Sequence, residues 1–95
     1  MADQQIQIKA SDDALKGSYS NMMQVTHLSE EFILDFMNIF PFQGVGVLSA
    51  RVIVSPGHLK RMITALEDNL KRYEATTGKK VEVGEAPSQE VGFHA

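Results

Sequence analysis

The sequence predicts an α+β domain: a three- or four-stranded antiparallel sheet followed by one long amphipathic C-terminal helix, with a sheet face packed in a homo-oligomer. Two observations predict the order of elements. Three short segments rich in apolar and β-branched residues are separated by turn-forming residues, and an apolar stripe of helical period follows them. A third observation predicts the oligomer, because the second of the three segments is apolar on both of its faces.

The first strand is expected within residues 19–28, YSNMMQVTHL, where side chains alternate in character. Tyr19, Met23 and Val25 would share one face, and Ser20, Gln24 and Thr26 the other. The polar residues 29–31 that follow predict a hairpin turn into the next strand.

The second strand lies in EFILDFMNIF, residues 31–40, and has no polar face. One face carries Phe32, Leu34 and Phe36, and the other carries Ile33, Met37 and Ile39. Pro41 ends the strand because proline cannot donate to a ladder. We expect the oligomer interface in this strand, at Ile33, Met37, Ile39, Phe32 and Phe36.

The third strand is predicted over residues 47–54, after the flexible loop 43–46. Leu48, Ala50, Val52 and Val54 would form an apolar face, opposite Val47, Ser49, Arg51 and Ile53. Asp35, a carboxylate within the apolar second strand, is expected to pair with Arg51 on this strand. The alternative is a general base with a raised pKa.

The helix is predicted from Pro56 to about Thr76. Ser55 is a favoured N-cap, and proline loses no needed hydrogen bond at the first helical position. Gly78 is placed to end the helix. The apolar residues recur at helical spacing: Leu59, Met62, Ile63, Leu66, Leu70 and Tyr73.

Self-association is predicted from burial. Burying a large apolar side chain is worth roughly 1.5–3 kcal/mol, and one helix can cover only one face of the second strand. The segment around Ile6 and Ile8 could form an extra edge strand that covers the other face, but it offers only two apolar side chains. We therefore expect a homodimer or a pair of dimers.

The chain is expected to divide into a flexible segment (1–16), a β-β-β-α domain (17–78) and a disordered acidic tail (79–95). Among its 95 residues there is no cysteine, which excludes disulfides and thiolate metal sites. No apolar run is long enough to span a bilayer, and the N-terminus has no apolar core of a secretory signal. We expect a cytoplasmic protein with no membrane partner.

Candidate catalytic groups are few. His27 is expected to hold the first turn with Glu30 or Glu31, His58 to cap or pack at the helix start, and His94 lies in the tail. The spacing of the histidines matches no zinc motif, and no nucleophile–base set can be argued. The sequence predicts no catalytic residues, no metal, no cofactor and no enzyme.

Residues 19–78 resemble a small prokaryotic family known as a domain of unknown function. The resemblance rests on a tyrosine-led strand, on the turn T-H-L-S-E-E-F, on L-D-F, and on the helix entry A-R-V-I-V-S-P-G-H-L-K-R. It carries no activity, and the occurrence of some members beside RNA polymerase subunit genes implies a link to transcription. The element order is also similar to that of the export chaperone SecB, an oligomer of sheet-packed dimers.

The function predicted from these features is a non-enzymatic, homo-oligomeric accessory module, scaffold or chaperone-like, that binds another protein. The alternative is a nucleic-acid or transcription-associated factor. It would use the basic residues of the helix, in a segment 56–80 that has six positive and three negative charges. Those on or near its polar face are Lys60, Arg61, Lys71 and Arg72.

Overall fold

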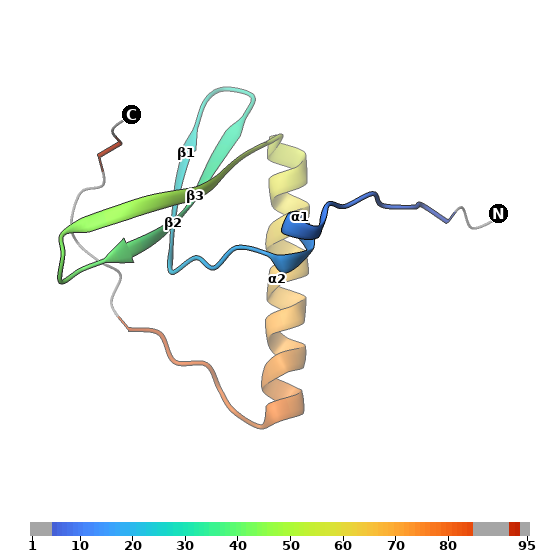
Figure 1. The fold of residues 1–95 in the computed structure, drawn as a ribbon. Helices are drawn as coiled ribbons and strands as arrows, with labels where there is room; N and C mark the ends of the chain where they lie inside the picture. Colours follow the sequence, from blue (N-terminus) through green and yellow to red (C-terminus); the bar gives the residue numbers. More distant parts are fainter. Residues whose placement is uncertain (1–4, 85–91, 94–95) are drawn as a thin grey trace. The chain divides into compact units, whose positions relative to one another are not determined.

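The computed structural model describes residues 5–84 and 92–93 (Figure 1). Two helices and three strands follow in the order α1 (Asp12–Lys16), β1 (Met22–His27), β2 (Phe32–Phe40), β3 (Val45–Val54) and α2 (Pro56–Thr77). The chain divides into two compact units, residues 1–60 and 61–95. The sheet lies wholly in the first unit, and most of α2 lies in the second. The α+β class and the order of the main elements are as predicted.

The three strands form one antiparallel sheet in the order β1-β2-β3, so β2 is central and β1 and β3 are its edges. The first hairpin turns through residues 28–31, where the Leu28 N–H donates to the Glu31 carbonyl at 2.8 Å. The second turns through residues 41–44. Gly44 adopts a φ of 65°, which favours glycine, and β3 starts at the next residue. The first turn lies where the sequence predicts it, whereas the second ends at Gly44, two residues before the end of the predicted loop.

A β-bulge interrupts the pairing of β2 with β3. Phe36 pairs with Ala50, but the next residue, Met37, pairs with Leu48, so Ser49 is an extra residue on β3. Because side chains alternate along a strand, one extra residue exchanges the faces on its two sides. The prediction for this strand is therefore wrong at two positions: Leu48 shares a face with Arg51, and Val47 shares a face with Ala50.

β1 is shorter than predicted because its first residues do not continue the ladder. The side chain of Asn21 takes the place of a backbone partner for Ile39. It accepts from the Ile39 N–H at 2.8 Å and donates to the Ile39 carbonyl at 3.0 Å. The Ser20 hydroxyl donates to the Met37 carbonyl at 3.1 Å. These side-chain bonds, together with the Asn21 N–H that donates to the Met37 carbonyl at 3.0 Å, hold residues 20 and 21 to β2 before the regular strand begins at Met22.

The N-terminal segment differs from the sequence prediction. Residues 5–10 adopt neither helix nor strand, so the extra edge strand proposed around Ile6 and Ile8 is absent from the described residues. Residues 12–16 instead form the short helix α1. The Ser11 side chain caps it by accepting from the Ala14 N–H at 3.1 Å. The predicted flexibility of residues 1–4 falls outside the described part of the chain.

α2 begins and ends where its sequence signals lie. The Ser55 hydroxyl accepts from the His58 N–H at 3.2 Å, and proline occupies the first helical position. At the other end Gly78 has a φ of 68°, and its N–H donates to the Glu74 carbonyl at 2.9 Å.

No helix or strand follows α2 within residues 78–84, and the predicted disordered tail lies mostly outside the described residues. Two hydrogen bonds join the start of this segment to the last turns of the helix. The Val81 N–H donates to a Glu74 carboxylate oxygen at 2.9 Å, and the Lys79 N–H donates to the Thr77 hydroxyl at 3.2 Å.

Few apolar side chains are buried in the part of the chain that the structure describes. They are Leu34, Met37 and Val54, with Leu34 only 2% exposed. Two of the three belong to β2, as expected for the central strand. The third, Val54, pairs with Phe32 at the start of that strand. The core is therefore centred on β2.

Candidate protein-binding surface

The register of the sheet assigns every strand residue except Ser49, the extra residue of the bulge, to one of two faces. We call them the Leu34 face and the Asp35 face after the buried residues of β2. The Leu34 face consists of Met23, Val25, His27, Phe32, Leu34, Phe36, Asn38, Phe40, Val45, Val47, Ala50, Val52 and Val54. The Asp35 face consists of Met22, Gln24, Thr26, Ile33, Asp35, Met37, Ile39, Gly46, Leu48, Arg51 and Ile53.

The Leu34 face is almost wholly apolar and largely open. Its exposed apolar side chains come from all three strands: Met23, Val25, Phe40, Val45, Val47 and Val52. The one polar cluster on it lies at the bulge. There the Asn38 amide donates to the Tyr19 carbonyl at 2.8 Å and to the Ser49 hydroxyl at 3.1 Å. These bonds satisfy the extra residue of β3.

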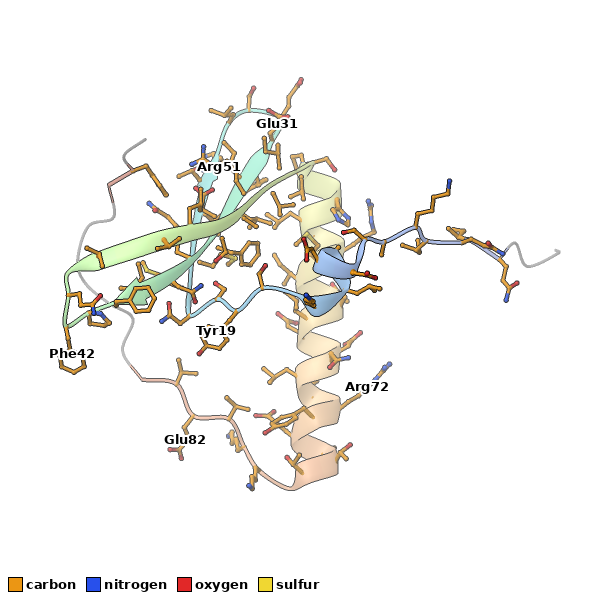
Figure 2. The ribbon with its side chains drawn as sticks, viewed as in Figure 1. Tyr19, Glu31, Phe42, Arg51, Arg72 and Glu82 are labelled. Carbon is orange, nitrogen blue, oxygen red and sulfur yellow. The ribbon has the colours of Figure 1, made fainter. Side chains whose placement is uncertain are left out.

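The Asp35 face has a charged pair at its centre. Arg51 lies directly opposite Asp35, and the two form a bidentate bond in which Nε is 2.6 Å from Oδ1 and Nη2 is 3.2 Å from Oδ2. The Asp35 residue is 3% exposed, whereas the Arg51 side chain is 47% exposed (Figure 2). The predicted pairing of these residues is confirmed.

The geometry favours a structural role for this carboxylate. Its hydrogen bond, and then its charge, raise the pKa of the Arg51 guanidinium above an already high ordinary value. A bidentate guanidinium engages one lone pair of each carboxylate oxygen, and the Asp35 residue is 3% exposed, so a substrate has little access to the carboxylate. The general-base alternative for Asp35 has no support in this arrangement.

Gln24 completes the central row of the Asp35 face, because it pairs with Asp35 from the β1 side. Its Oε1 is buried and accepts no hydrogen bond within the described residues. A buried amide oxygen without a donor is destabilising by about 1–3 kcal/mol. In this row the Asp35 carboxylate is therefore hydrogen-bonded from β3, whereas the Gln24 Oε1 on β1 has no donor within the described residues.

The residues predicted to form the oligomer interface are divided between the two faces. Phe32 and Phe36 lie on the Leu34 face, whereas the rest of the predicted set lies on the Asp35 face. Met37 is buried within the single chain, and Ile33 and Ile39 are half-buried. Beside them, Leu48 and Ile53 of β3 are exposed. One face-to-face contact cannot use all five predicted residues.

The more exposed apolar residues lie on β3, which the sequence prediction began two residues late and left out of the interface. Nine of its ten residues are exposed, from Val45 to Ile53. The tip of the adjoining turn is also open, with Phe42 fully exposed (Figure 2). The alternation of small and β-branched residues from Val45 onward could have indicated the earlier start of this strand. Gly44 and Gly46 instead led to the prediction of a loop over residues 43–46.

The histidines form no site in the described residues. The His27 ring lies 5.7 Å from that of Phe32, its cross-strand neighbour on the Leu34 face. No hydrogen bond joins it to Glu30 or Glu31 in the described chain, so the predicted turn contact is replaced by a ring contact. His58 lies in the first turn of α2 as predicted, and His94 falls outside the described residues. No group of three or more metal-binding side chains occurs within residues 5–84 and 92–93.

The basic residues of α2 lie on its exposed surface in two pairs separated by acidic residues. Lys60 and Lys71 are eleven residues apart, about three turns or 16 Å, as are Arg61 and Arg72. Glu67 and Asp68 lie between the two pairs on the same side of the helix. Within the described residues neither acid lies within ion-pair distance of Lys71 or Arg72.

None of the helices in the described residues has the length and apolar character needed to cross a bilayer.

Comparison with known proteins identifies a family but no individual relative. A family model described as a protein of unknown function, DUF3467, matches residues 1–80. No curated protein matches the chain, and no solved structure matches it. The likeness to SecB therefore still rests on element order alone.

Proposed function

The chain belongs to the DUF3467 family, and from that premise we propose that it is a cytoplasmic, non-enzymatic, homo-oligomeric accessory module that binds another protein. The observation that carries the proposal is the exposure of apolar side chains on both faces of the sheet. Val25 and Val52 lie open on the Leu34 face, and Leu48 and Ile53 lie open on the Asp35 face.

Burial energetics support a second molecule on the sheet. Each large apolar side chain moved from water into a packed contact contributes roughly 1.5–3 kcal/mol. An amphipathic helix has a single apolar stripe and can bury at most one sheet face. A single helix would therefore leave several exposed valine, leucine or isoleucine side chains on at least one face of the sheet. Contiguous apolar patches of this kind mark protein interaction sites.

The chemistry of the sheet favours a protein partner over a small ligand. The exposed groups are branched aliphatic side chains spread over three strands, with the charged pair at the centre of the Asp35 face. Pockets for small molecules place a few polar groups around a concave apolar site. Protein interfaces instead combine an apolar centre with few charges. A scaffold or chaperone-like role fits the second pattern.

Two measurements test the proposal. Sedimentation velocity at micromolar concentration should give a homodimer or a dimer of dimers, and a stable monomer would contradict the oligomeric part. Photo-crosslinking in the native host tests the partner, with the crosslinking amino acid at Met23 on the Leu34 face. A matched control carries it at Lys9, outside the sheet. We expect a discrete heterologous adduct from position 23 alone, and equal labelling from both positions would refute a specific surface.

The alternative function is nucleic-acid binding through the exposed basic residues of α2. The two basic pairs, 60–61 and 71–72, are spaced along one side of the helix. The logarithm of the binding affinity would fall linearly with the logarithm of the salt concentration, and each phosphate contact would make that slope steeper. Charge reversal at all four positions should then abolish retention on heparin or DNA. If the unmodified chain is retained and the reversed variant is retained equally, α2 is not the binding element.

A further inference from the structure

β3 is a free sheet edge whose length and composition suit pairing with another strand. It has ten residues, and no strand lies along its outer side within the described chain. Natural edge strands are protected by short length, proline, charged side chains or β-bulges. The bulge at Ser49 does not end β3, because its pairing with β2 continues on both sides. β3 has neither proline nor lysine. Its one charge, Arg51, is bound to Asp35 on the neighbouring strand.

The other edge of the sheet is different. β1 has six residues, against ten in β3, and the residue ahead of it, Asn21, is bonded through its side chain to Ile39. Only a short ladder can therefore be added at β1. A partner strand at β3 could form a ladder of up to ten residues, so β3 is the stronger site for strand addition.

The bulge makes β3 complementary to itself. Consider two copies running antiparallel about a twofold axis between Ser49 and Ala50. Val45 then lies opposite Val54 of the other copy, and Val47 lies opposite Val52. All four valines belong to the Leu34 face, because the extra residue at 49 exchanges the faces on its two sides.

The same register matches the second face. Leu48 lies opposite Arg51 of the other copy, and Gly46 lies opposite Ile53, all on the Asp35 face. This register pairs eight of the ten residues with same-face neighbours and sets Ser49, the extra residue of the bulge, opposite Ala50. A shift by one residue would set residues of opposite faces against each other on both sides of the bulge, and a shift by two would shorten the ladder, so this register pairs the most residues with matching faces.

We propose that β3 pairs antiparallel with β3 of a second copy, Val47 facing Val52 of that copy, to form one continuous six-stranded sheet. The proposal rests on the homo-oligomer of the proposed function and names the contact that builds it. The interface is isologous, so each cross-strand pair occurs twice. Charge does not oppose it, because Arg51 faces Leu48 and not another arginine.

Single-cysteine chains test the register directly, because the native chain has no cysteine. Val47→Cys and Val52→Cys are prepared separately, mixed and oxidised, and the products are weighed by mass spectrometry. We expect the mixed disulfide to form at least tenfold faster than either symmetric disulfide. The control mixes Val52→Cys with Leu15→Cys, an exposed helix position outside the sheet, and should give no such preference.

A second pair of variants separates edge pairing from face packing. Both carry Val47→Lys, combined with Val52→Glu in one chain and with Val52→Lys in the other. Edge pairing sets each position 47 against position 52 of the other copy. The Lys–Glu variant should therefore dimerise about tenfold or more tightly than the Lys–Lys variant. Packing through the Leu34 face would bury charges in both variants and weaken both alike.

The outcomes distinguish this inference from the proposed function. A dimer that shows both the mixed disulfide and the charge preference supports β3 pairing. A dimer with neither overturns the β3 contact and leaves the homo-oligomer intact. A monomer at all accessible concentrations overturns both. Binding of an added extended peptide along β3 in place of a second copy would also overturn the proposal.

Discussion

Replacement of Leu34 by alanine should remove a large part of the stability of the sheet. Leu34 is the most buried apolar residue in the described chain, at 2% exposure, and it lies at the centre of β2 with neighbours on both sides. The substitution deletes three carbon groups at about 0.8 kcal/mol each. A further contribution comes from the cavity, because the two flanking strands can collapse only in part. The expected loss in free energy of unfolding is about 3 kcal/mol.

That loss is large for a domain of this size. Stabilities of natural domains are on the order of 0.05–0.15 kcal/mol per residue, so the folded part of this chain has few kcal/mol to lose. Leu34→Ala should shift the urea midpoint strongly downward at equal protein concentration. The m-value should be retained if the native state remains compact.

Val25 provides the matched control, because it lies directly opposite Leu34 on the same face but is 44% exposed. Val25→Ala deletes two carbon groups that are already partly in water, and it should cost about 1 kcal/mol or less. Urea titrations followed by circular dichroism compare the two. If Val25→Ala costs as much as Leu34→Ala, then β2 is not the centre of the core, and the burial argument is wrong.

Three further predictions concern the cap, the ion pair and the start of β1. Ser55→Ala should lower the free energy of unfolding by about 1 kcal/mol, because the His58 N–H loses its acceptor. An unchanged free energy of unfolding in a urea titration would show that Ser55 does not cap the helix. Arg51→Gln should lower the melting temperature by the same amount at every pH from 6 to 9. The raised pKa of Arg51 means that its charge is lost only at far higher pH, and a difference that grows with pH in this range would contradict this. Asn21→Ala should raise amide exchange at Ile39, because its N–H loses its acceptor, the Asn21 Oδ1. Unchanged protection would show that this bond does not hold the start of β1 to β2.

Much of the fold follows from local signals. The hairpin at residues 28–31, the strand end at Pro41 and the helix from Pro56 to Gly78 each depend on residues a few positions apart. The structure confirms all three. The two-sided character of β2 is equally local, because alternation along one strand assigns its faces.

The pairing of Asp35 with Arg51 was also predictable, although sixteen residues separate them. A carboxylate within an apolar strand requires a partner, and the neighbouring strand offers one cation. The interface residues stay a prediction. Residue type placed them on β2, but β2 is the central strand, and its own neighbours already bury Leu34 and Met37.

The sequence alone determined that three strands and one long helix form, because alternation, turn residues and helix caps act over a few neighbouring positions. The tertiary structure decided which side chains share a face on β3. The bulge at Ser49 exists only in the pairing with β2, so it exchanges Val47 and Leu48 in a way that no local pattern could show. It likewise decided where β1 begins, since Asn21 bonds to Ile39 eighteen residues away. Contacts between distant segments set the register, and the register sets the surface that this protein presents.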